Sequence, residues 1–188
     1  MTGGRAAAAA GLVVRDARPD ERAAVRELTL RAYDEYATAM APAAWAGLSA
    51  AVRAALDSDD GAAERIVAVH DGTLVGSVFL YPPQASAYGD LAGRATSPEL
   101  RLLAVAPEAR GLGVGRALVD ECVRRARRAG ARELGLHTSA TMRVAMRMYE
   151  RMGFVRAPEH DFQPEGAEVV EGYRLPLGAA DAPALGGG

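Results

Sequence analysis

A glycine-rich turn in the middle of the chain has the residue types that could hold an anion. Arg110 is followed by Gly111, Gly113 and Gly115, between an apolar run that predicts a strand and a run that predicts a helix. Glycines let an anion approach the main chain closely, and the first amides of a helix have no intrahelical partner. Arg110 can add a charge-assisted contact. The turn therefore predicts a phosphate site, although many such turns hold no ligand.

The composition excludes some phosphate chemistry. All 22 basic residues are arginine, and the chain has neither lysine nor asparagine. A Walker A loop and a Schiff-base enzyme both need lysine, so neither can be present. A nucleotide bound at the glycine turn is an alternative that the missing lysine disfavours.

Three segments resemble the GNAT superfamily of acyl-CoA N-acyltransferases. Residues 99–108, Glu-Leu-Arg-Leu-Leu-Ala-Val-Ala-Pro-Glu, resemble the family's fourth strand and its exit, and residues 110–115 resemble its Gln/Arg-x-x-Gly-x-Gly/Ala signature. Residues 148–154, Met-Tyr-Glu-Arg-Met-Gly-Phe, resemble its Leu-Tyr-Glu-x-x-Gly-Phe segment. The resemblance covers roughly residues 12–177. It implies direct acetyl transfer from acetyl-CoA to a primary amine of a small molecule or peptide, in a ternary complex and without a metal.

The resemblance also implies where acetyl-CoA binds. The pyrophosphate would lie on the amides of the glycine turn, and the pantetheine arm would run beside the strand at 103–105, whose side chains could equally be core. The residues implied are Leu103, Ala104, Val105, Arg110, Gly111, Leu112, Gly113, Val114, Gly115, Arg116 and Met142. Relatives commonly have asparagine at the position of Met142, contacting the pantetheine arm. That polar contact is lost here.

Two residues receive catalytic roles from the resemblance. Glu99 matches a glutamate that removes the amine proton through water in some members, and partial burial would raise its pKa toward the working range. The alternative for Glu99 is a surface charge paired with Arg101. Tyr149 matches a tyrosine that protonates the leaving sulfur, and its alternative is a core aromatic. A free amide at a bulge around Leu103 would form the oxyanion site.

The acceptor pocket is the least determined part. Relatives build it where this chain has Tyr33, Tyr36, Trp45, Tyr88 and Phe162. His137 could be a second base, but a structural role is favoured, and Cys122 is expected in the core rather than as a nucleophile. The arginine run at 124–128 is expected to be a solvated helix face.

The elements that would position these residues follow from periodicity and from turn signals. Strands are expected at 12–15, 65–70, 74–81, 99–105, 133–138, 154–157 and 168–177. Helices are expected from Pro19, at 43–56, from the glycine turn to about 129, and at 141–152. Asp71-Gly72 predicts a hairpin, and 82–98 predicts a surface connection. Together with the resemblance, this order predicts an α/β GNAT fold: a mixed, mostly antiparallel twisted sheet flanked by helices, whose parallel strands 4 and 5 splay apart.

Composition limits the remaining possibilities. The chain has 188 residues, 49% of them apolar, and a net charge of −2. These values favour a single domain at 12–177 with flexible tails at 1–11 and 178–188, and they disfavour nucleic-acid or membrane partners. One cysteine and no metal-binding pattern favour a cytoplasmic, metal-free protein. A homodimer is a further possibility.

A protein that binds acyl-CoA without catalysis, as a sensor or partner subunit, is the alternative function. The loss of asparagine at Met142 mildly favours it. The amine acceptor and the acyl-chain preference do not follow from the sequence.

Overall fold

The computed structural model describes residues 11–58, 61–83, 96–165 and 167–178, and Tyr88 lies outside them. Seven strands form one sheet in the order β1-β2-β3-β4-β5-β7-β6. Their bounds are β1 Leu12–Asp16, β2 Glu64–His70, β3 Thr73–Tyr81, β4 Glu99–Val105, β5 Glu133–Ser139, β6 Val155–Arg156 and β7 Val170–Pro176. Every neighbouring pair is antiparallel except β4 and β5, which are parallel. The predicted mixed sheet is confirmed.

The helices connect and cover these strands. The α-helices are α2 Arg22–Tyr33, α3 Pro42–Asp57, α4 Val114–Arg128 and α5 Arg143–Arg151. Short 3₁₀ turns are η1 Pro19–Glu21, η2 Asp34–Ala37, η3 Pro107–Ala109 and η4 Pro158–His160. No helix in the described ranges is long and apolar enough to cross a membrane.

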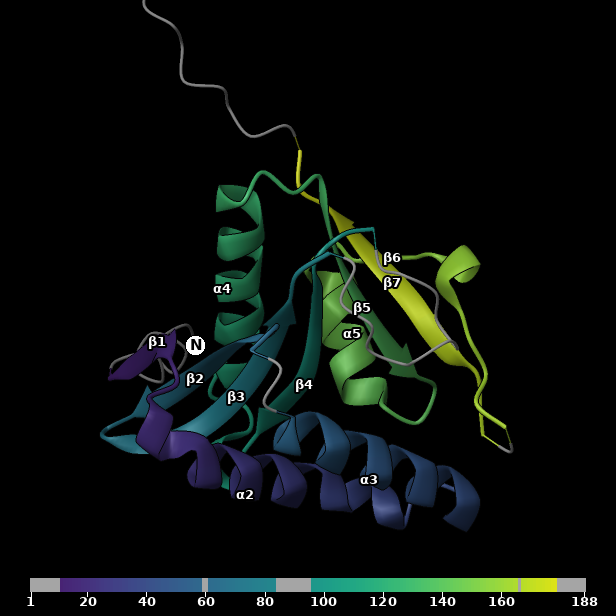
Figure 1. Ribbon diagram of the computed structural model, residues 1–188, viewed down its shortest axis with the longest axis horizontal. Coiled ribbons are helices and arrows are strands. Elements are labelled where there is room, and N and C mark those ends of the chain that lie inside the picture. The colour runs from purple at the N-terminus through teal and green to yellow at the C-terminus, as the bar shows by residue number, and fades with distance from the viewer. Residues whose placement is uncertain (1–10, 59–60, 84–95, 166, 179–188) are drawn as a thin grey trace, which may run out of the picture.

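Two apolar clusters form on the sheet. Alternate residues of a strand face opposite sides, so Ile66 and Val67 of β2 join different clusters. Val25 of α2 and Val52 of α3 pack with Val67 on one side, where Figure 1 shows α2 and α3 lying next to each other. Helices α4 and α5 pack with Ile66 in the larger cluster. The sheet is therefore covered by helices on both faces.

The tight turns follow local residue chemistry. Asp71 and Gly72 both have positive φ, 48° and 81°, as the Asp-Gly hairpin signal predicts. Gly130 ends α4 with φ of 75°, and Gly153 follows α5 with φ of 94°. These glycines fix where α4 ends and where α5 turns into β6.

The arginine run on α4 departs from expectation. The side chain of Arg125 is only 12% exposed and pairs with Asp16 at 2.5 Å, Glu64 at 2.6 Å and Glu121 at 2.7 Å. Arg125 therefore ties α4 to β1 and β2, and a wholly solvated face is the wrong interpretation for it. Arg124, Arg127 and Arg128 are exposed, as expected.

Candidate active site

The parallel strands β4 and β5 stay together only at one end. Their registered pair is Glu99 opposite Gly135, and the amide of Gly135 donates to the carbonyl oxygen of Pro98 at 2.8 Å. No further pair joins the two strands over the described residues, so they separate toward the glycine turn. The splayed geometry predicted for this position is confirmed.

A bulge lies in β4 where the strands separate. Its register with β3 shifts between Ser77 and Phe79, and Leu102 has φ of 52°, in the left-handed region that non-glycine residues rarely adopt. Leu102 and Leu103 lie between the registered residues Arg101 and Ala104, so the bulge is present around Leu103 as expected. Bulges leave main-chain groups outside the strand ladder, and such a donor can stabilise a developing oxyanion.

The glycine turn has the backbone that an anion site requires. Gly111 and Gly113 have φ of 81° and 84°, and a Cβ on either would meet no atom within 4 Å. Gly113 is the N-cap of α4, so the first amides of that helix open into this space. At Gly115 the reason differs, because a Cβ there would lie 3.3 Å from the sulfur of Met148. Gly115 therefore lets α4 approach α5.

The two arginines predicted at this turn already have acidic partners. Arg110 pairs with Glu35 at 2.7 Å, and Arg116 pairs with Asp120 at 3.4 Å. All four side chains are about half exposed. The guanidinium groups are therefore accessible, but an incoming phosphate must share or displace a carboxylate.

The apolar residues predicted to line the cofactor divide into two groups. Ala104 and Val114 are buried in the larger core cluster. Leu103, Val105 and Leu112 are only partly buried against that cluster, which leaves part of each surface available beside the gap.

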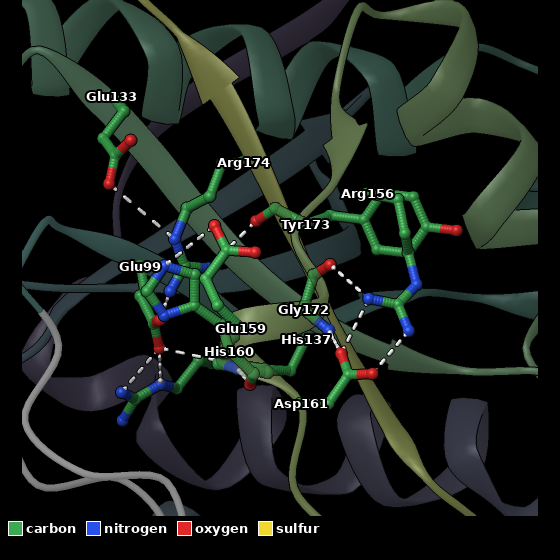
Figure 2. A network of polar contacts seen from close by, with 11 residues as sticks. Glu99, Glu133, His137, Arg156, Glu159, His160, Asp161, Gly172, Tyr173 and Arg174 are labelled. Carbon is green, nitrogen blue, oxygen red and sulfur yellow. Dashed lines mark hydrogen bonds and ion pairs between the residues drawn. The ribbon is translucent and has the colours of Figure 1, made fainter.

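Glu99 lies in a buried cluster of cations (Figure 2). One carboxylate oxygen accepts from Arg174 at 3.1 Å, and the other accepts from Arg101 at 2.9 Å and lies 3.6 Å from Nδ1 of His137. Arg101 also lies over the ring of Tyr81, 4.4 Å from its centroid. Because Glu99 is 2% exposed, it is not the surface charge of the alternative interpretation, although its pairing with Arg101 is confirmed.

The charge state of Glu99 follows from these partners. Burial acts to raise the pKa of Glu99, but the hydrogen bond and charge of His137, and the charge and hydrogen bond of Arg101, outweigh it and lower the pKa to about 2. The expected raised pKa is therefore wrong. Burial is more than offset because the cations lie in direct contact with the carboxylate.

His137 joins Glu99 to the segment after β6. Its Nε2 lies 3.0 Å from the carbonyl oxygen of His160, so this nitrogen has a hydrogen to donate. Its ring also packs edge-on against Phe162 at 5.3 Å between centroids. These contacts support the structural role that was favoured for His137.

Sequence reasoning missed Arg174 and Gly135. A Cβ on Gly135 would lie 2.7 Å from Nη1 of Arg174 and 3.0 Å from Cγ of Glu99, so a glycine is needed where the ion pair crosses β5. An arginine in the last apolar strand was the available signal. Its partner, however, lies 75 residues away.

Tyr149 and Met142 lie at α5. Tyr149 is buried in the larger cluster, with its ring edge-on to Phe154 at 5.7 Å, and it follows Met148, which contacts Gly115. Met142 is the partly buried N-cap residue of α5. The core packing expected as the alternative for Tyr149 is present, and the preceding residue, Met148, places this part of α5 against α4.

Three hydroxyl groups at the two ends of the β4–β5 pair lack hydrogen-bond partners within the described residues. Ser97 precedes β4, and Thr138 and Ser139 end β5; all three are buried. Buried hydroxyls normally have a partner in the protein, in water or in a ligand. The end of β5 next to the gap is therefore equipped to bind a polar group.

The aromatic residues predicted for the acceptor pocket do not form one cluster in the described contacts. Tyr33 and Tyr36 pack edge to face at 5.8 Å, and burial followed by the charge of Glu35 raises the pKa of Tyr36. Glu35 in turn pairs with Arg110 of the glycine turn. Trp45 is half-buried on α3, while Phe162 contacts His137.

Neither a metal centre nor a cysteine nucleophile has support within the described ranges. No group of three or more metal-binding side chains is present there. Cys122 is fully buried, and burial raises its pKa to about 12, which rules out a ready thiolate nucleophile.

The site geometry agrees with a family match. The model of the acetyltransferase (GNAT) family matches residues 22–154. The chain belongs to the GNAT family. A mycothiol acetyltransferase from Cellulomonas flavigena is 37% identical over 91 residues, which are 48% of this chain and 26% of that protein. The chain thus spans about a quarter of that relative's length.

Solved structures share the fold. A protein described as histone acetyltransferase HPA2 and related acetyltransferase from Corynebacterium glutamicum has a TM-score of 0.64 at 21% identity, covering 88% of this chain and 96% of that one. A GNAT family acetyltransferase from Brucella melitensis in complex with acetyl-CoA has a TM-score of 0.54 at 24% identity, covering 85% and 94%.

Proposed function

We propose that the chain is an N-acetyltransferase that transfers an acetyl group from acetyl-CoA to a primary amine of a small molecule or peptide, in the cytoplasm. The observation that carries this proposal is the joint geometry of β4 and α4. The bulge at Leu102, the end of β4 beside the gap, and the left-handed Gly111 and Gly113 before α4 follow one another along the chain, and the proposal takes them as one path. That path suits a ligand with a diphosphate at one end and an acyl group at the other.

The chain's own groups fit such a ligand. The amides at the start of α4 and the guanidinium of Arg110 would hold the diphosphate, and the partly buried side chains of Leu103 and Val105 would border the arm. The space at the missing Cβ atoms of Gly111 and Gly113 is what a close-lying phosphate needs. Acetyl-CoA supplies the thioester; the relative from Brucella melitensis, crystallised with acetyl-CoA, supports this choice.

Two side chains divide the remaining tasks. The phenol hydroxyl of Tyr149 would donate a proton to the departing sulfur. A main-chain amide at the bulge would stabilise the oxyanion. Glu99 keeps its negative charge between two guanidinium groups and beside the imidazole of His137, and so would hold β4, β5 and β7 together rather than accept a proton.

Acetyl-CoA binding and turnover test the proposal separately. Isothermal titration should detect acetyl-CoA binding, and release of free thiol should then depend on an added amine. Binding without turnover over a broad amine panel would establish the alternative of an acyl-CoA-binding partner protein, which Met142 favours. No binding at millimolar acetyl-CoA would overturn both.

Tyr149→Phe tests the proton donor. We expect kcat to fall roughly 100-fold while the Kd for acetyl-CoA changes little, because general-acid help contributes about 10²–10⁴ in rate. Tyr173→Phe, which alters a buried phenol on β7, is the matched control and should retain kcat. Equal kcat in the wild type and Tyr149→Phe would remove Tyr149 from the mechanism.

A further inference from the structure

Both oxygens of the Glu99 carboxylate are already engaged by cations. Arg174 contacts one oxygen at 3.1 Å, and Arg101 contacts the other through Nη2 at 2.9 Å and Nε at 3.3 Å. To take a proton from an amine, Glu99 would have to give up part of this pairing. The neutral acid would also remove the carboxylate charge that both buried guanidinium groups contact, which is costly.

The groups around Glu99 do not offer a substitute base. Each strand around it contributes a guanidinium, an imidazole or a phenol: Arg101 comes from β4, His137 from β5, Arg174 from β7, and Tyr81 from β3, beneath Arg101. His137 is 4% exposed; its Nε2 faces a carbonyl oxygen and its Nδ1 faces Glu99. Both ring nitrogens of His137 therefore face groups of the protein itself.

The other carboxylate of this network is Glu133. It lies beyond Arg174, with its Oε1 3.8 Å from the Nε of that arginine, and Arg174 stands between it and Glu99 (Figure 2). Among the described residues of this network, each group that could accept a proton is thus already engaged by another group of the network.

The chemistry of acetyl transfer then restricts the acceptor. The amine lone pair forms the C–N bond to the thioester carbonyl carbon, the C–S bond breaks, and the sulfur leaves with its electron pair. The surplus proton on nitrogen ends on the sulfur, so the products are an amide and a thiol. Only an unprotonated amine can begin this sequence, and an acceptor that the Glu99 network does not deprotonate must arrive unprotonated.

Amines differ widely in the fraction that is unprotonated near neutral pH. At pH 7.5, about a third of α-amino groups are neutral, but only about one ε-amino group in a thousand is, given pKa values near 7.8 and 10.4. We propose that the acceptor is an amine of low basicity, such as the α-amino group of an amino acid or of a peptide, rather than a lysine side chain or a polyamine. This inference rests on the proposed acetyl transfer.

Acceptors matched in shape but not in basicity test the inference on the wild-type protein. One peptide has a free N-terminus and norleucine in place of lysine; the other is N-terminally blocked and has a free lysine. Ethylamine and its fluorinated analogues form a second series, in which successive fluorine atoms lower the amine pKa. The measured quantity is kcat/KM for each acceptor between pH 6 and 10.

We expect the rising limb of each pH profile to move with the pKa of the acceptor itself. At pH 7.5 we expect kcat/KM for the α-amine to exceed that for the ε-amine by about tenfold to roughly 250-fold. The upper limit is the ratio of the neutral fractions of the two amines. The lower limit allows for the greater nucleophilicity of the neutral ε-amine, which offsets part of that ratio. The advantage should vanish near pH 10. If kcat/KM rose at the same pH for all acceptors, or were equal for both peptides at pH 7.5, the inference would be wrong but the proposed acetyl transfer would still hold. Failure to acetylate any amine would instead overturn the proposed function and this inference with it.

Discussion

Gly135 decides whether Glu99 and Arg174 can meet across β5. A methyl group there would lie 2.7 Å from Nη1 of Arg174, closer than real Cβ contacts allow. We expect Gly135→Ala to lower the free energy of unfolding by about 1–3 kcal/mol, because the buried ion pair must shift and lose contacts. Urea unfolding followed by circular dichroism measures the change.

Gly47 provides the control for this substitution. It lies in α3, and a Cβ there would meet nothing within 4 Å. Gly47→Ala should raise the free energy of unfolding by up to about 1 kcal/mol, because alanine is the better helix residue. If Gly135→Ala behaved like Gly47→Ala, the close approach of Arg174 at β5 would be disproved.

Thr138 tests whether the orphaned hydroxyls cost stability in the ligand-free protein. Its Oγ1 is buried without a partner within the described residues, so Thr138→Val should raise the free energy of unfolding by roughly 1 kcal/mol. Thr29 is the matched control, because its hydroxyl donates to the carbonyl oxygen of Val25 at 2.8 Å and lies 3.0 Å from the Ser77 hydroxyl. Thr29→Val should lower the free energy of unfolding, because it removes these hydrogen bonds. A similar loss in both variants, measured by thermal unfolding, would contradict the prediction.

At the scale of elements, the start of α4 couples backbone conformation to ligand binding. Gly113 and Gly130 both have positive φ, 84° and 75°, at opposite ends of this helix, and neither has an atom within 4 Å of a Cβ position. Alanine at either position should cost about 1 kcal/mol of stability through backbone strain. Only Gly113→Ala should also weaken acetyl-CoA binding, by tenfold or more, because its methyl group enters the proposed phosphate site. Isothermal titration of both variants measures the difference; equal Kd values would argue against that site.

Elements defined by local patterns could be predicted from sequence, whereas contacts between distant elements could not. The Asp71-Gly72 hairpin and the α4 cap at Gly130 depend on nearby residues, and β4 begins and ends as predicted. The partners of Arg125 lie on β1 and β2 as well as on α4, so the charge run on α4 gave no sign of them.

The same limit applies to the site. The glycine turn, Glu99 and Tyr149 belong to short motifs that are visible in the sequence. The environment of Glu99 is assembled from three strands, and Arg174 comes from the last of them. Burial alone predicted a raised pKa for Glu99, but cations brought by β5 and β4 reverse its direction.

For the whole molecule, ion pairs between elements make stability depend on acidity. The pKa of Glu99 is about 2, where burial is outweighed by His137 and Arg101, and that of Glu21 is lowered to about 2, first by its hydrogen bond with Arg15. Both carboxyls ionise near pH 4.5 when unfolded, so their stabilisation is complete above that pH. It is lost as the pH falls from about 4.5 toward 2.

Thermal unfolding between pH 7 and pH 2 tests this prediction, and salt separates the two contributions. We expect Tm to vary little down to about pH 5 and then to fall steeply. The Arg15–Glu21 pair is partly exposed and should weaken in about 1 M NaCl, whereas the Glu99 cluster is shielded from solvent and should keep its acid dependence. A Tm that stayed constant to pH 2, or an acid transition abolished by salt, would mean that Glu99 is not held ionised by buried cations. The proposed role of Glu99 as a fixed negative charge beside the gap would then be disproved.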